Sequence, residues 1–450
     1  MDLKPHGYRV GAHDAWFEDA AVPLPRNGVD DDNTTPFVAT ARRVIEPWLS
    51  AVFQSEHLNL LVGSGLTISI AHLAGAKATT MTKVALGSPY DAQIDAHAKA
   101  SAERMGRGEP NIEDQFRSAL ALLEGLQILG QPFESERKKL EEALNQQLRN
   151  FLGSILETER GIATASHWIR AVSHLQSFLM SFASRAASRE RLHIFTTNYD
   201  RLIEYGCDLA GLRVIDRFVG SLNPVFRSSR AEIDVHYNPP GIRGEPRYLE
   251  GVVRLTKLHG SVDWHYDGRR RSIVRKGLPF GAPVDHSDIP KSCTEALMIY
   301  PNASKDVETT AYPYSDLFRD FASSLCRPHS AVITYGYGFG DDHVNRVLED
   351  MLTIPSTHAV IITYAPDNRL LAFLERVGRP AQISLLVGSH FADMERLVAY
   401  YLPKPAVDYI TTRMAELVKR RGEVTHESHV SAPEGALPAG GQAAESDIPF

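Results

Sequence analysis

Two closely spaced glycines follow an apolar run near residue 60, and their spacing is typical of a turn that binds an anion. The run Leu58–Val62 leads into Gly63, Ser64 and Gly65. Glycine permits a tight turn and lets backbone N–H groups approach an anion where the next helix begins. However, Ile68 stands where a dinucleotide-binding turn carries its third glycine, and the Lys-Ser/Thr pair of a P-loop is missing. The segment alone is equally compatible with a turn that binds no ligand.

A second apolar run delivers hydroxyl, amide and carboxylate groups to one point of the chain. The run begins at His193 and leads to Thr197, Asn198 and Asp200. These polar side chains stand at the end of an apolar strand, where a parallel-sheet fold places functional groups. Asn and Asp are also common helix caps, so a structural role remains open for both residues.

A histidine ends a third apolar run. His259 follows Val253–Leu258, and Gly260 removes side-chain bulk beside it. A histidine at the end of a strand stands where a parallel-sheet fold places functional groups. The structural alternative, a histidine held by hydrogen bonds at the end of a strand, also stays open.

A fourth segment repeats the pattern of apolar run, glycine turn and helix. The run Ala331–Tyr335 leads into Gly336 and Gly338, which allow close approach of a sugar or a phosphate. Asp341 or Asp342 then offers a carboxylate to hydroxyl groups, although either is also a natural N-cap for the next helix.

The elements around these segments predict an α/β fold. Apolar runs typical of strands alternate with amphipathic helical patterns, and the later strands are expected at 331–335, 359–364 and 383–387. This alternation predicts a Rossmann-like, mostly parallel sheet with helices on both faces. Ligands in such folds bind at the carboxyl ends of the strands, where the four segments lie.

The chain divides into four parts by pattern. We expect an N-terminal arm over 1–36 and one Rossmann-like domain over 37–422. Three apolar stripes at helical spacing predict a helical insertion over 98–190 within that domain. A last helix is expected from Pro405 to Gly422, and the composition of 423–450 predicts a disordered tail.

Composition excludes several classes of protein. The chain has 450 residues and a net charge of -7, so direct binding to nucleic acid is not expected. The one dense basic run, Arg269–Lys276, is predicted to be an arm of a hairpin. Cys207, Cys293 and Cys326 fit neither a disulfide framework nor a zinc site, which indicates a reducing compartment. Without a signal peptide or a membrane-spanning run, the protein is expected to be cytoplasmic.

Taken in order, the four segments resemble the sirtuin superfamily. Gly63-Ser-Gly is similar to its Gly-Ala-Gly phosphate loop, and Thr196-Thr-Asn-Tyr-Asp to its Thr-Gln-Asn-Ile-Asp motif. His259-Gly resembles its catalytic His-Gly, and Gly336-Tyr-Gly-Phe its Gly-Thr-Ser turn. The form found in this chain is most similar to the divergent bacterial sirtuin-like NADases of antiphage defence.

The resemblance implies that NAD is bound and cleaved at the bond between nicotinamide and ribose, giving nicotinamide and ADP-ribose. It makes Asn198 the residue that orients the ribose or the attacking water, and His259 the base. The residues that it places against NAD are Gly63, Ser64 and Gly65 at the diphosphate, Asp200 at the nicotinamide carboxamide, and Thr67, Thr197, Gly336, Gly338 and Asp341 elsewhere.

Departures from the family favour hydrolysis of NAD over deacetylation of proteins. Deacetylase sirtuins carry a four-cysteine zinc ribbon, which three scattered cysteines cannot build, so no zinc is expected. Their Pro-Asp-Phe-Arg segment is also absent, and Gly338 replaces a serine of the Gly-Thr-Ser turn. An NAD-dependent deacylase, an ADP-ribosyltransferase and a non-catalytic nucleotide-binding module for assembly remain as alternatives.

The resemblance also suggests partners. Similar proteins pair with a hexameric helicase-like ATPase or a short Argonaute-like protein, or they form oligomers. We expect a homo-oligomer of low activity whose helical insertion responds to a partner or trigger.

Overall fold

The computed structural model describes residues 4–18, 36–79, 83–104, 110–186, 188–230, 234–237, 247–289, 296–298 and 312–404. The helix predicted from Pro405 and the tail predicted over 423–450 lie outside the described residues.

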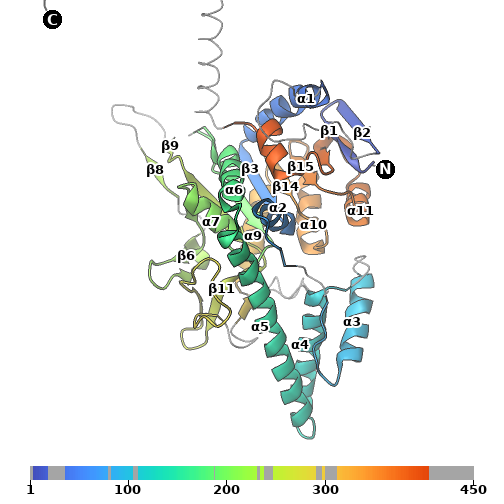
Figure 1. Cartoon of the computed structure of the whole chain (residues 1–450), viewed down its shortest axis with the longest axis vertical. Coiled ribbons are helices and arrows are strands. Elements are labelled where there is room, and N and C mark those ends of the chain that lie inside the picture. The colour runs from blue at the N-terminus through green and yellow to red at the C-terminus, as the bar shows by residue number, and fades with distance from the viewer. Residues whose placement is uncertain are drawn as a thin grey trace, which may run out of the picture. The chain divides into compact units, whose positions relative to one another are not determined.

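A nine-stranded sheet organises the domain (Figure 1). Its strand order is β2-β1-β16-β15-β14-β3-β4-β10-β5, and every pair from β16 to β5 is parallel. The predicted α/β fold with a mostly parallel sheet is therefore confirmed. The strands are β1 (His6–Val10), β2 (His13–Phe17), β3 (His57–Val62), β4 (His193–Thr196), β5 (Arg213–Ile215), β10 (Val252–Lys257), β14 (Ser330–Tyr335), β15 (His358–Thr363) and β16 (Ile383–Val387).

Helices cover both faces of this sheet. Neighbouring residues of a strand point to opposite faces, so Leu60 and Leu61 of β3 belong to two different apolar cores. The first core is covered by α1 (Pro36–Phe53), α2 (Ser64–Ala74), α6 (Trp168–Ala183), α7 (Leu202–Leu209), α12 (Met394–Arg396) and a π-helical turn, Leu397–Tyr401. The second is covered by α9 (Tyr314–Leu325), α10 (Asp342–Leu352) and α11 (Asn368–Val377).

The helical insertion forms a core of its own. Figure 1 shows α3 (Asp91–Arg104), α4 (Ile112–Leu129) and α5 (Glu134–Thr164) extending together away from the sheet. Their apolar stripes share a core that also contains Tyr199 and Val262 of the main domain. The third predicted stripe, which lies on α6, packs instead on the large sheet.

A smaller, antiparallel sheet is built from strands that precede and follow β10 in the chain. Its strands are β6 (Phe218–Val219), β7 (Val225–Phe226), β11 (Gly260–Asp267), β12 (Ser272–Arg275) and β13 (Ala296–Met298), and a separate pair joins β8 (His236–Tyr237) to β9 (Arg247–Tyr248). The predicted hairpin with a basic arm is confirmed, because β11 pairs with β12. Short 3-10 turns lie at Ser228–Arg230 and Pro380–Gln382.

Two segments differ from the sequence-based expectation. Within the expected N-terminal arm, β1 and β2 form a hairpin, and β1 pairs with β16 at the sheet edge. The helix after β4 begins only at Leu202, with Arg201 rather than Asn198 or Asp200 at its N-cap position. Asp200 Oδ1 accepts a hydrogen bond from the Leu202 backbone N–H, which holds the preceding residues in a turn.

Candidate functional site

The loops after four parallel strands meet at one cavity of about 290 Å³. Val62, Thr196, Lys257 and Tyr335 end their strands in a common row of the sheet, so the segments that follow them emerge side by side. Nine of the eleven predicted site residues line this cavity: Gly63, Ser64, Thr67, Thr197, Asn198, Asp200, His259, Gly338 and Asp341. The tertiary structure thus brings the four segments together as their order predicted.

The other two predicted site residues, Gly65 and Gly336, pack against each other. A Cβ atom built on Gly65 would lie 2.5 Å from the Gly336 Cα, and Gly336 has a φ of 61°. These glycines therefore allow two backbone turns to touch.

The backbone N–H groups of this turn are also partly used within the protein. Gly63 N–H donates to the Tyr335 carbonyl at 3.1 Å, and Gly65 N–H donates to the Gly336 carbonyl at 3.0 Å. The prediction that both groups bind a diphosphate therefore needs correction. Ser64, as the first residue of α2, remains the better placed of the three to meet an anion, because the positive end of the helix dipole lies there.

Asn198 joins the first two segments through its side chain. Its Nδ2 donates to the Gly63 carbonyl at 3.0 Å and to Thr67 Oγ1 at 3.1 Å. Thr67 Oγ1 in turn donates to Asp200 Oδ2 at 2.7 Å. The amide nitrogen therefore orients the glycine turn, and Oδ1 is the atom of Asn198 that can meet a substrate or a water.

Two ionisable groups behind Asp200 hold this loop in place. Lys257 Nζ donates to the Asp200 carbonyl and lies 3.1 Å from Glu204 Oε1. Burial raises the pKa of Glu204, and the ammonium of Lys257 opposes that rise. The loop that carries Asn198 is thereby fixed from the side away from the cavity.

His259 occupies a sharp corner between the two sheets. Only Leu258 and His259 separate β10 from β11, and Gly260 accommodates the turn with a φ of 87°. His259 is only 2% exposed. Its surroundings are the cavity and a second histidine on α10.

The imidazoles of His259 and His343 meet almost in line. Their Nε2 atoms lie 3.0 Å apart, and their ring centres lie 5.2 Å apart. The nitrogens therefore lie close to the line between the ring centres, as in an N–H···N hydrogen bond. Ring contacts with Phe318 and Tyr199 flank the pair.

Asp341 completes a group of possible metal ligands with these histidines. One ligand atom from each of the three residues lies within 4.8 Å of the others. Two imidazoles bound to one ion would converge on a point beside the line that joins them, whereas these point at each other. Asp341 stands at the N-cap position of α10, yet its side chain makes no capping bond. The geometry favours a hydrogen-bonded histidine pair with a carboxylate beside it.

A neutral phenol from the fourth segment closes part of the cavity. Tyr337 OH donates to Asn345 Oδ1 at 2.9 Å and contacts the Asp341 carbonyl at 3.2 Å. Burial raises the pKa of Tyr337 well above its ordinary range, so the group stays a neutral donor. The turn that carries Gly338 is thus fixed from behind.

One wall of the cavity comes from residues that sequence reasoning missed. The insertion and the segment before it contribute Thr79, Asn111, Glu113, Phe151, Ile155 and Thr158, and α11 contributes Arg369. The apolar stripes predicted that α4 and α5 are helices, but no pattern in the sequence indicated that their polar residues belong to a site. His343 lay within the fourth segment, although its type alone did not pair it with His259.

Comparison with known families agrees with this geometry. Residues 192–379 match the family model of the SIR2-like domain. The chain is thus similar to SIR2-like proteins over these residues. The match includes Asn198, His259 and Asp341, and it confirms the predicted resemblance to the divergent sirtuin-like proteins. This similarity indicates an NAD-related function. No curated protein matches the chain significantly.

The match does not include the Gly63 turn or the helical insertion, which lie before residue 192. These parts are joined to the matched region by the contacts described above. Within the described ranges, none of the helices has the length and apolar character needed to cross a membrane.

Proposed function

We propose that this protein hydrolyses NAD at the bond between nicotinamide and ribose, and so depletes NAD as an effector of bacterial antiphage defence. One observation carries the proposal. Asn198 and His259 follow neighbouring strands of the sheet and line the same cavity as Gly63 and Ser64. A SIR2-like domain supplies the family context.

The reaction makes limited demands on the protein. Nicotinamide leaves C1′ of the ribose as a neutral molecule, and the transition state resembles an oxocarbenium ion. The protein must hold ribose and diphosphate, place negative potential near C1′ and position a water. In this proposal Asn198 Oδ1 orients the ribose or the water, and His259 accepts the proton that the water loses.

Two alternatives belong to other reaction classes. An NAD-dependent deacylase or an ADP-ribosyltransferase would transfer the ADP-ribosyl group to an acceptor other than water. The three scattered cysteines, which cannot form the zinc ribbon of deacetylase sirtuins, count against the deacylase. A non-catalytic module for assembly would have no need for the Asn198 and His259 pair in one cavity.

Incubation with NAD separates these functions. The purified protein should release nicotinamide and ADP-ribose in equal amounts, measured by liquid chromatography. ADP-ribose attached to protein would support the transferase, and release of nicotinamide only with an acylated peptide would support the deacylase. If the protein binds NAD but leaves it intact, the result would support the non-catalytic module and contradict the proposal.

Control of the activity is a second part of the proposal. An unregulated NAD hydrolase would harm its host, so we propose a homo-oligomer of low activity that a partner or trigger activates through the insertion. A roughly 100-fold population shift needs only ~2.7 kcal/mol of differential binding. Light scattering after size-exclusion chromatography, with an NADase assay beside it, tests this idea. A fully active monomer would contradict it.

A further inference from the structure

We propose that Glu113, supplied by the helical insertion, is a catalytic residue of this site. The inference rests on the proposed cleavage of NAD. In it, the Glu113 carboxylate contacts the ribose next to the bond that breaks and stabilises the positive charge of the transition state.

Glu113 is held in the cavity wall by a neighbour of Asn198. It lies in the first turn of α4, only 8% exposed, and lines the cavity that Asn198 and His259 also line. Its Oε1 accepts a hydrogen bond from Tyr199 OH at 2.9 Å. Tyr199 is fixed by edge-on packing against Phe151 of α5 at 5.8 Å. The carboxylate is therefore positioned by the same loop that positions Asn198.

The start of a helix commonly carries acidic residues, but other residues serve that purpose here. The side chain of Asn111 accepts from the Asp114 N–H at 3.0 Å, and the side chain of Asp114 accepts from the Asn111 N–H at 3.1 Å. This reciprocal capping box forms without Glu113, whose Oε2 instead accepts a hydrogen bond from Asn111 Nδ2 at 3.3 Å. Burial of a carboxylate is costly, so a role at the cavity accounts for it better than capping does.

The three acids of the cavity come from different parts of the chain. Asp200 accepts from Thr67 Oγ1 and from the Leu202 N–H, one bond on each carboxylate oxygen. Asp341 lies beside the histidine pair. Glu113 is thus the acid that the insertion adds to a site otherwise built from the sheet.

The chemistry of cleavage explains why an acid there would help. The bond from C1′ to the nicotinamide nitrogen breaks, and its electron pair leaves with nicotinamide. Water then adds to C1′ and gives a proton to His259, so NAD and water yield nicotinamide, ADP-ribose and one proton. A fixed carboxylate in a buried site favours the positive charge that develops on the ribose, and it remains unchanged by the reaction.

The variant Glu113→Gln tests this role on the full-length protein. We expect kcat for nicotinamide release to fall roughly 100-fold, because the charge is lost while the shape is kept. Binding of carba-NAD, an analogue that cannot be cleaved, should change less than about threefold, since the ground state carries little of this charge. Glu113→Asp should recover part of kcat. The matched control is Glu124→Gln on the exposed side of the same helix, which should behave as the wild type.

The outcomes separate this inference from the proposed function. Wild-type kcat in a folded Glu113→Gln variant would overturn the role of Glu113 and leave NAD hydrolysis intact. A parallel loss of carba-NAD binding and melting temperature would make Glu113 a structural residue, and would also overturn the inference. A wild type that neither binds carba-NAD nor cleaves NAD would overturn the proposed function, and the inference with it.

Discussion

The two edges of the large sheet both gather polar side chains, but they use them in different ways. At the carboxyl edge, four loops and the insertion place polar groups around a cavity of about 290 Å³. At the amino edge, a larger cavity of about 920 Å³ is lined by arginines, acids, serines and two histidines. Volume and polarity alone would favour the second cavity as the ligand-binding site. The hydrogen bonds and ion pairs of the lining groups distinguish the two cavities.

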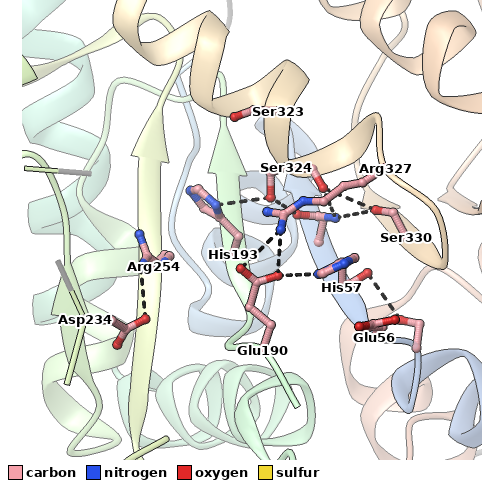
Figure 2. Close-up of polar contacts among 12 residues, drawn as sticks. Glu56, His57, Glu190, His193, Asp234, Arg254, Ser323, Ser324, Arg327 and Ser330 are labelled. Carbon is pink, nitrogen blue, oxygen red and sulfur yellow. Dashed lines mark hydrogen bonds and ion pairs between the residues drawn. The ribbon is translucent and has the colours of Figure 1, made fainter. Parts of the chain in front are cut away.

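The amino edge bonds its polar groups to each other. Figure 2 shows Glu190 between His57 and Arg327, where its carboxylate bonds to the His57 imidazole and forms an ion pair with Arg327. Asn59, at the start of β3, donates to Ser330 Oγ at 3.0 Å and accepts from Ser324 Oγ at 2.7 Å. These contacts connect β3, β4, α9 and β14 where the strands begin.

The charges of the amino-edge cavity are also paired within the protein. Arg217 forms two bonds of 2.6 Å with Asp320, and Arg254 lies 2.9 Å from Asp234. Such pairs keep little affinity for an outside anion. Polar groups that bond mainly to one another, as at the amino edge, stabilise the fold. Polar groups arranged around a cavity at the carboxyl ends of strands are placed to bind a ligand.

The strongest test of this comparison removes polar side chains from each edge in turn, beginning with the carboxyl edge. Asn198→Ala and His259→Ala should each lower NAD cleavage by roughly 10²–10⁴-fold, because the variants lose the groups proposed to act on ribose and water. Nicotinamide release measured by chromatography gives the rate. Near wild-type turnover in either variant would show that the site assignment is wrong.

Asn59→Ala is the matched variant at the amino edge. It leaves buried partners without their bonds, so the free energy of unfolding should fall by about 1–3 kcal/mol in urea titrations. The kcat of the folded variant should remain that of the wild type. Loss of kcat without loss of stability would mean that the amino edge takes part in catalysis.

Contact between the two glycine turns at the carboxyl edge should matter for stability as well as activity. In Gly65→Ala the new Cβ would lie 2.5 Å from the Gly336 Cα, so backbone must move and about 2–3 kcal/mol of stability should be lost. The control is Gly125→Ala inside α4, where no atom lies within 4 Å of the added Cβ, and it should gain up to ~1 kcal/mol. Melting curves of both variants measure the difference, and equal melting temperatures would contradict it.

The smallest expected effect concerns pH and the partly buried histidines at the starts of β4 and β15. Burial, aided by nearby arginines, lowers the pKa of His193 well below its ordinary value, and burial lowers the pKa of His358 to about 4. Their unfolded pKa is near ~6.5, so below that pH the unfolded chain binds protons that the folded protein excludes. Stability should therefore be fully present above pH ~6.5 and should decline as the pH falls toward ~4.

Unfolding in urea at neutral pH and at pH ~5 measures this decline. His358→Gln should lose about 1–2 kcal/mol less than the wild type between the two conditions, because one titrating group has been removed. An equal loss in both proteins would show that His358 does not contribute.

The sequence predicted the parallel sheet and the edge at which the site lies. Apolar runs of strand length, each followed by glycine or a polar residue, fix where strands end, and parallel strands bring their ends to one edge. For that reason Asn198, His259 and Asp341 could be assigned to one site before any coordinate was known. The first strand pair was missed, because β1 and β2 have no sustained alternation and are held by pairing with β16.

Tertiary structure alone decided which partners these residues have. The in-line meeting of His259 with His343 depends on how α10 packs against the corner between the sheets, and spacing in the chain does not encode that. The pairing of Gly65 with Gly336 arises in the same way, since 271 positions along the chain separate two turns that touch. Glu113 enters the cavity because the insertion folds back on Tyr199. Periodicity along the sequence reports local structure and burial, whereas contacts between distant segments depend on the packing of the whole domain.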